Sequence, residues 1–223
     1  MKKVQIVLGA ILLVIAGCDE AQPPGAQKSG GPFPDQILSD FEVHMTRGER
    51  KSAEIAADKG VVYRKRDSML LQGLTARLYD SEGLHSSTLW ADSGLLRERQ
   101  KKMLAHGNVH LESRDSLHLS SDSLFWYGEL GAPSAAEIDS GAAEDRYMVA
   151  KGHVHLITRD SVHLWTDTLL WNDISRKVAT DAYVTIVRSK GDIIEGHGLR
   201  SDEQLQTVTI LRAVTGTVRE GSR

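Results

Sequence analysis

The sequence contains one cysteine, Cys18, in 223 residues, so no disulfide bond can form within the chain. It also has little net charge, because 27 Lys and Arg side chains stand against 30 Asp and Glu side chains, a formal net charge of -3. A chain with this balance has no broad basic surface, which argues against binding to nucleic acid or to an anionic membrane face. Sheet pairing and apolar burial must therefore supply the stability.

Motifs for catalysis are missing as well. The sequence has no Gly-x-Ser-x-Gly elbow, no His-Glu-x-x-His zinc motif and no glycine-rich phosphate loop. Helical periodicity is nearly absent, so a helix-based site is not expected either. We predict that the protein is not an enzyme and needs no cofactor.

The amino terminus has the pattern of a secretory signal peptide. Met1-Lys2-Lys3 is followed by an uncharged run from Val4 to Ile15, which is too short to be an ordinary membrane-spanning helix. Residues 15–18, Ile-Ala-Gly-Cys, resemble the lipobox of bacterial lipoproteins, in which the cysteine is acylated and becomes the first mature residue. We therefore expect a signal peptide over residues 1–17 and a lipid anchor on Cys18.

The rest of the chain divides by composition. Residues 18–36 are rich in Pro, Gly, Gln and Ser, which is typical of a flexible linker. Residues 37–218 are long enough for one domain with a substantial core, and residues 219–223 form a short tail. Asp19 resembles the signal that retains a lipoprotein in the inner membrane. We expect a periplasmic protein anchored there, with the outer membrane as the alternative.

The domain contains a repeated stretch. Residues 105–126 read AHGNVHLESRDSLHLSSDSLFW, and residues 150–171, 45 residues further on, read AKGHVHLITRDSVHLWTDTLLW. Self-similarity at such a period is typical of stacked supersecondary units that share one core. A weaker copy surrounds Arg66-Asp67-Ser68.

Within each copy, apolar and polar residues alternate, as in Val109-His110-Leu111 and Val154-His155-Leu156, which predicts half-buried β-strands. A hairpin loop at Ser113-Arg114-Asp115 would place Leu111 opposite Leu117 and His110 opposite His118. Further alternating segments between residues 41 and 214 extend the pattern. The sequence therefore predicts an all-β, antiparallel domain.

Histidines recur on the polar face of these strands, at His110, His118, His155 and His163. A cross-strand histidine pair with a carboxylate could bind Zn²⁺. A metal site usually occurs once, however, whereas these histidines recur with the repeat as an outward polar row would. We predict no metal site, and a histidine-metal hydrolase on a β scaffold stays as an alternative.

Three stretches resemble the LptC family, the periplasmic component of the lipopolysaccharide export bridge, and the β-jellyroll domains that it shares with LptA and LptD. They are residues 74–83 (LTARLYDSEG), residues 105–111 with residues 121–124, and residues 191–201 (GDIIEGHGLRS). Their order and spacing carry the resemblance, which covers most of residues 37–218. It implies a single antiparallel β-jellyroll with an open, V-shaped groove between two sheets. The best-known members use an amino-terminal membrane helix, whereas this chain would use a lipid on Cys18.

The resemblance also implies a function. The protein would receive lipopolysaccharide from an export ABC transporter of the LptB, LptF and LptG type and pass it to an LptA-type periplasmic protein, with the acyl chains in the groove. The alternatives are a closed sandwich core in a structural lipoprotein, or an LptA-like lipoprotein of the outer membrane. The residues predicted to line the groove are Val109, Leu111, Leu117, Leu119, Leu124, Trp126, Val154, Leu156, Val162, Leu164, Leu169 and Trp171.

The last predicted strand, residues 206–214, alternates too and has no later strand to pair with. Its only charge is Arg212 and it contains no Pro, so it is poorly protected as a free edge. The resemblance implies that this edge joins the sheet of the LptA-type partner through main-chain hydrogen bonds. The predicted edge residues are Thr207, Val208, Thr209, Ile210 and Leu211.

Overall fold

The computed structural model describes residues 33–128, 147–172 and 174–217. The predicted signal peptide, Cys18, Asp19, most of the linker and the tail lie outside the described residues. All described strands belong to one compact unit, Pro34–Arg223. Among the described residues, no helix is long and apolar enough to cross a membrane.

The described residues form an all-β fold, as the sequence predicts. Eleven strands make one sheet, in which each strand pairs antiparallel with its neighbour in the sequence. One 3-10 turn, Arg64–Arg66, follows the second strand. The strands are β1 Gln36–Arg47, β2 Arg50–Tyr63, β3 Ser68–Tyr79, β4 His85–Arg97, β5 Lys102–Ser113, β6 His118–Tyr127, β7 Tyr147–Ile157, β8 His163–Asn172, β9 Lys177–Val187, β10 Ile193–Asp202 and β11 Val208–Thr217.

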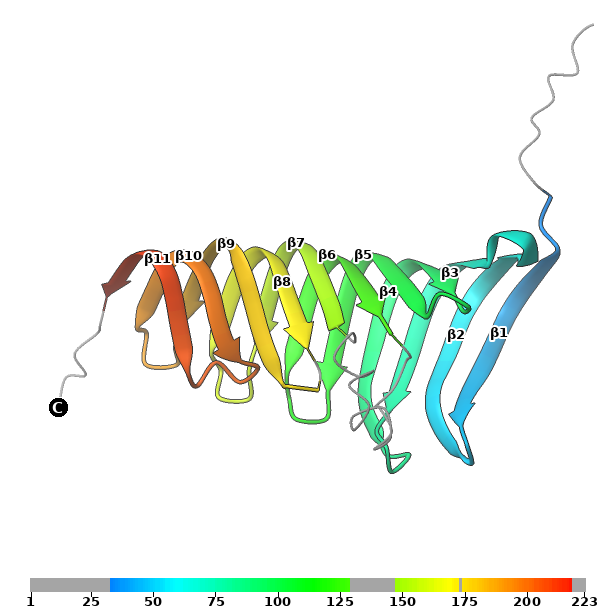
Figure 1. The fold of residues 1–223 in the computed structure, drawn as a ribbon, viewed down its shortest axis with the longest axis horizontal. Coiled ribbons are helices and arrows are strands. Elements are labelled where there is room, and N and C mark those ends of the chain that lie inside the picture. Colours follow the sequence, from blue (N-terminus) through cyan, green and yellow to red (C-terminus); the bar gives the residue numbers. More distant parts are fainter. Residues whose placement is uncertain (1–32, 129–146, 173, 218–223) are drawn as a thin grey trace, which may run out of the picture. The chain divides into compact units, whose positions relative to one another are not determined.

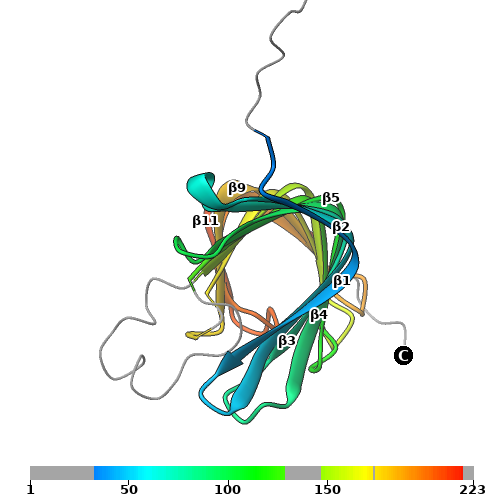
Figure 2. The ribbon, with the colours of Figure 1, turned by 90° about the vertical axis from the view of Figure 1, so that its right-hand side faces the viewer.

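The two layers expected from the sequence are two halves of this single sheet. The strands follow one another from β1 to β11 (Figure 1), and a view along their succession shows them curving around a common interior (Figure 2). The apolar residues of each strand face that interior and form one core cluster. The turns after β1, β3, β5, β7 and β9 form what we call the first margin of the sheet. The described turns after β2, β4, β8 and β10 form the second margin.

Glycine corners bend the strands. Gly107 and Asn108 of β5 have φ values of 79° and 44°, and Gly152 and His153 of β7 have φ values of 77° and 46°. Positive φ is readily adopted by glycine, and asparagine and histidine tolerate it better than most residues. The ladders of β5 with β6 and of β7 with β8 shift register at these residues. Each corner is therefore a β-bulge that turns the strand and increases its twist.

An aspartate on the preceding strand packs against each corner. Asn108 Nδ2 donates a hydrogen bond to Asp92 Oδ2 at 2.9 Å, and His153 Nδ1 lies 2.9 Å from Asp122 Oδ2. The Asp122 carboxylate raises the pKa of His153 through this hydrogen bond. The Gly-Asn and Gly-His pairs of the repeat thus form the bends of the sheet.

The predicted hairpin register is wrong by two residues. Leu111 pairs with Leu119 and His110 with Ser120, because the three-residue loop is Arg114-Asp115-Ser116. Ser116 takes φ 59°, the left-handed conformation that ends this type of loop. A shift of two residues keeps every side chain on its predicted face, so the division into apolar and polar faces is unaffected.

Gly152→Ala should destabilise the fold strongly. An added Cβ would lie less than 3.0 Å from three atoms of Asp122, and alanine would be forced into positive φ. We expect the free energy of unfolding to fall by about 2–4 kcal/mol in urea titrations, from backbone strain together with the clash. Gly48→Ala is the matched control, because Gly48 has φ 61° but open space around its Cβ position. That variant should lose only about 1 kcal/mol. Equal losses would contradict a specific corner contact.

Candidate functional site

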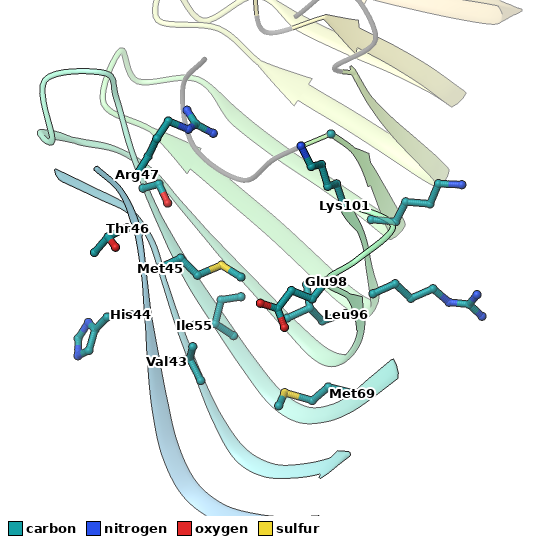
Figure 3. A pocket seen from close by; sticks show the side chains of 14 residues that line it. Val43, His44, Met45, Thr46, Arg47, Ile55, Met69, Leu96, Glu98 and Lys101 are labelled. Carbon is teal, nitrogen blue, oxygen red and sulfur yellow. The ribbon is translucent and has the colours of Figure 1, made fainter. Parts of the chain in front are cut away.

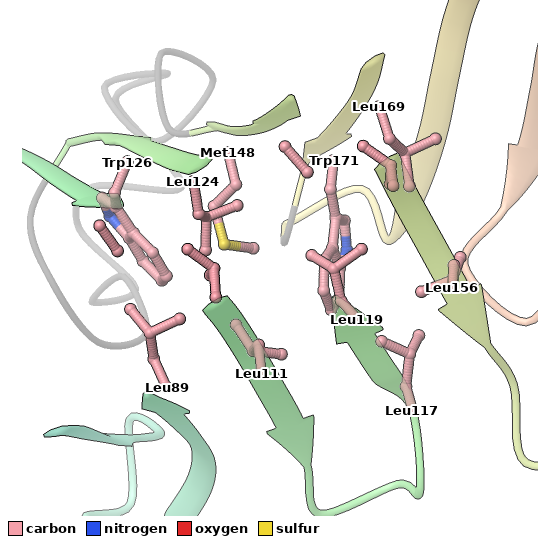
Figure 4. Close-up of a cluster of buried hydrophobic side chains, with 14 of the residues drawn as sticks. Leu89, Leu111, Leu117, Leu119, Leu124, Trp126, Met148, Leu156, Leu169 and Trp171 are labelled. Carbon is pink, nitrogen blue, oxygen red and sulfur yellow. The ribbon is translucent and has the colours of Figure 1, made fainter. Parts of the chain in front are cut away.

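The residues predicted to line a groove all lie on the inner face. Figure 4 shows several of them, among them Leu111, Leu119, Trp126 and Trp171, pointing into one cluster. All twelve are buried, with exposed fractions from 0% to 9%. Their own side chains therefore fill much of the interior between β5 and β8. The structure confirms their shared face, and their contact with a lipid stays a prediction.

An open apolar cavity lies at the β1 end of the interior. It has a volume of about 490 Å³, within the size range of small-molecule sites. Its apolar wall comes from four strands, and Figure 3 shows these side chains around it. The wall residues are Val43 and Met45 of β1, Ile55 of β2, Met69 of β3 and Leu96 of β4.

The mouth of this β1-end cavity is rich in positive charge. Among the described residues that line it, Arg47, Arg97, Lys101 and Lys102 are cationic and Glu98 is the one carboxylate. Arg47 belongs to β1, whereas the other residues belong to β4, β5 and the turn between them, so the charges come from both margins of the sheet. The chain as a whole has a formal net charge of -3, so this excess is local. An apolar wall beneath cationic side chains suits an amphiphile with an anionic head group.

None of these cavity residues is among those predicted from the sequence to line a groove. The alternation of Val43 and Met45 was visible as a strand signal, and Met69 belongs to the weaker repeat copy. Nothing in the sequence marks their section of the interior as open, because that depends on how far apart the two margins of the folded sheet lie. The sequence pattern indicates only the two clear repeats, and the interior of that part is largely filled by side chains.

A smaller cavity of about 240 Å³ lies beneath the middle of the sheet margins. Its apolar wall includes Trp126, Met148 and Trp171, and its rim carries Asp115 and Arg176. Arg176 lowers the pKa of Asp115 by donating a hydrogen bond to its carboxylate, so both groups are charged at neutral pH. Three of the predicted lining residues, Leu111, Trp126 and Trp171, therefore border this cavity.

The histidines of the outer face have different partners in the two copies of the repeat. His155 Nε2 lies 3.0 Å from His163 Nδ1, and both rings stack on Trp165. Burial lowers the pKa of His155, and the neighbouring His163 lowers it further. In the first copy, His118 Nδ1 instead lies 3.4 Å from Glu112 Oε1. The two copies thus differ in their contacts, as expected of a polar face.

A different group brings together ligand atoms of the kinds that bind metals. Glu42, His44 and Glu54 have such atoms within 4.8 Å of one another. Glu54, however, already accepts hydrogen bonds from Lys51 and from the Tyr79 hydroxyl, and Arg77 lies 3.9 Å from it. These donors satisfy the carboxylate and add positive charge, which opposes a metal cation. The cluster fastens β1 and β3 to β2 beside the open cavity.

The fold and the site define a class: a single curled β-sheet around an apolar interior, with a cationic mouth at one end. No protein-family model matches the sequence, and no curated protein matches it. Among solved structures, the chain is similar to LptH, described as the LptA homologous periplasmic component of the conserved lipopolysaccharide transport device from Pseudomonas aeruginosa. The identity is 14%, the match covers 60% of this chain and 95% of that chain, and the TM-score is 0.48.

The Glu54 cluster makes stability depend on pH. The hydrogen bonds from Lys51 and then Tyr79 lower the pKa of Glu54 from 4.5 to about 2. Because the folded pKa is the lower one, the stabilisation is complete above the unfolded value and is lost as pH falls from about 4.5 to about 2. Glu54→Gln should therefore be destabilising near neutral pH, and the difference from the native protein should shrink across that window.

Urea unfolding measured from about pH 7 down to about pH 2.5 tests this expectation. Glu42→Gln is the control, because the Glu42 side chain is 44% exposed and should contribute little at any pH. A Glu54→Gln penalty that stays constant with pH would contradict the charged contacts.

Proposed function

We propose that the protein binds lipopolysaccharide as a membrane-tethered component of a lipopolysaccharide export bridge, with acyl chains in the curled-sheet interior. The observation that carries this proposal is the β1-end cavity, which combines an apolar wall with an excess of cationic side chains at its mouth. Each buried methylene contributes about 0.8 kcal/mol, so a few methylenes give useful affinity. Lipopolysaccharide fits this arrangement because it joins several acyl chains to an anionic head group.

The sequence resemblance supports the finer role. The Gly107-Asn108-Val109 motif, which resembles the shared motif of the LptC, LptA and LptD domains, forms a corner that bends the sheet around its interior. In this proposal the lipid anchor on Cys18 holds the domain at the inner membrane. The protein then receives lipopolysaccharide from an LptB, LptF and LptG-type transporter and hands it to an LptA-type protein.

The edge strand β11 is the proposed handover surface. In the described part of the chain, β11 pairs on one side only, with β10. It begins at Val208, so Thr207 precedes the strand, and most of its residues are exposed, including Leu211 and Val214. An open strand edge can accept a strand from a partner through main-chain hydrogen bonds. This would continue both the sheet and its interior into the partner.

Photo-crosslinking from Met69 tests lipid binding. Met69 lines the β1-end cavity, whereas its neighbour Leu70 points to the opposite face and is 45% exposed. A photoreactive amino acid at Met69 should give adducts in cells that a lipopolysaccharide antibody detects, and the same group at Leu70 should give few or none. Equal adducts from both positions, or none from Met69 in a folded protein, would reject the proposed site.

Deletion of β11 tests the handover surface. A chain ending after Thr207 keeps Glu203 and Leu205, which are both buried, and lacks the edge strand and residues 218–223. We expect it to lose capture of the LptA-type partner in pull-down assays but to retain lipid crosslinking from Met69. Circular dichroism and melting of the same preparation control for folding. Undiminished partner capture would place the docking edge elsewhere.

A further inference from the structure

The two margins of the sheet contact each other through several turns. One contact joins Arg159, in the turn between β7 and β8, to Gln204, in the turn between β10 and β11, where Arg159 N donates a hydrogen bond to Gln204 Oε1 at 3.4 Å. Arg176, in the turn between β8 and β9, has its Nη2 atom 2.9 Å from Asp115 Oδ2, in the turn between β5 and β6. Asp115 belongs to the first margin, and Arg176 to the second. Arg176 also pairs with Glu203 of the turn between β10 and β11. We call the contacts among Asp115, Arg176 and Glu203 the clasp.

The clasp lies directly over the smaller cavity. Asp115, Arg176 and Glu203 line that cavity together with Trp126 and Trp171. Trp171 Nε1 donates a hydrogen bond to Glu203 Oε2 at 3.2 Å, which ties the inner face to the clasp. Glu203 is buried, and Leu205 of the same turn is 1% exposed. The clasp thus covers the middle of the interior, between the β1-end cavity and β11.

We propose that the clasp is a side gate, whose opening lets an acyl chain pass between the two margins to reach the inner face at Trp126 and Trp171. This inference rests on the proposed function and adds the route by which the lipid enters. The acyl chain enters sideways while the head group stays outside, so the lipid need not be threaded lengthwise through the β1 end.

The contacts between the two margins suit reversible opening. The Arg176 and Asp115 side chains are 58% and 49% exposed, so water and salt weaken their pairing. The ladder hydrogen bonds run between neighbouring strands, from β1 to β11, and none of these ladders joins the two margins. Separating the margins therefore breaks side-chain contacts while leaving the sheet paired, and the glycine corners are where the strands can flex.

A crosslink that can be removed tests the gate. Asp115→Cys and Arg176→Cys are combined in the full chain with Cys18→Ser, so that only the two new thiols react. Trp90→Phe and Trp165→Phe leave Trp126 and Trp171 as the remaining tryptophans. A bifunctional methanethiosulfonate reagent joins the two thiols, and a reductant releases this crosslink.

The probe is a brominated stearic acid, whose bromine quenches the fluorescence of a tryptophan that it contacts. Stopped-flow fluorescence measures the rate of this quenching.

We expect quenching in the unlinked protein, at least about tenfold slower quenching after crosslinking, and full recovery with reductant. The same chemistry at Asp181→Cys and Arg200→Cys is the matched control. That native pair is 3.0 Å apart but joins the adjacent strands β9 and β10, so its crosslink should leave the rate unchanged. In a protein with native cysteine content, Arg176→Gln should speed quenching, and Arg200→Gln should not.

Each of the other outcomes rejects either the gate or the proposed function. Equal rates in the linked and reduced proteins would overturn the gate, because the lipid would then enter without separating the margins. Absence of quenching in the unlinked protein, together with lipopolysaccharide adducts from Met69, would also overturn the gate but leave the proposed function standing. Absence of both signals would reject the proposed function itself.

Discussion

The bend at the glycine corners is the constraint on which the rest of the structure depends. An eleven-strand meander without bends would be an open sheet with one apolar face in water. Positive φ at Gly107 and Gly152 turns the strands in mid-course, and the aspartates of the preceding strands fill the space that a Cβ would otherwise occupy. One sheet thereby supplies both walls of its own interior. The corners are therefore as necessary to the core as the leucines that fill it.

The interior differs along the succession of strands. Where the repeat is clear, Leu and Trp side chains from both halves of the sheet meet, and the cavity of about 240 Å³ lies beside Trp126 and Trp171. At the β1 end, several inward positions of β1 and β2 carry smaller or unbranched residues, among them Val43, Met45 and Ala53, and the cavity of about 490 Å³ remains. Methionine is flexible and adapts to irregular surfaces, which would suit a wall for acyl chains of varied length in the proposed function.

Much of the fold could be predicted because alternation depends only on local sequence. The all-β class, and the inner face that includes Leu111 and Leu164, follow from period-2 patterning alone. The hairpin register could not be fixed in this way, because it depends on whether Ser116 or Asp115 ends the loop, and serine in the left-handed conformation is uncommon. The open cavity and the clasp were also beyond reach. Asp115 and Arg176 are 61 residues apart and meet only when the two margins close.

In the proposed function, the charges along the two margins bear on where a lipid head group would lie. Among the described residues, the lining of the β1-end cavity holds four cationic side chains and one carboxylate, which would favour an anionic head group. At the clasp, Arg176 is already shared between Asp115 and Glu203, so an anion must compete with carboxylates that the protein itself supplies. Head groups would thus be favoured at the open mouth and opposed in the middle, whereas acyl chains would find apolar walls in both places. On this proposal, a lipid that moved along the two margins would be held by its chains throughout, and its head group would meet a barrier at the clasp.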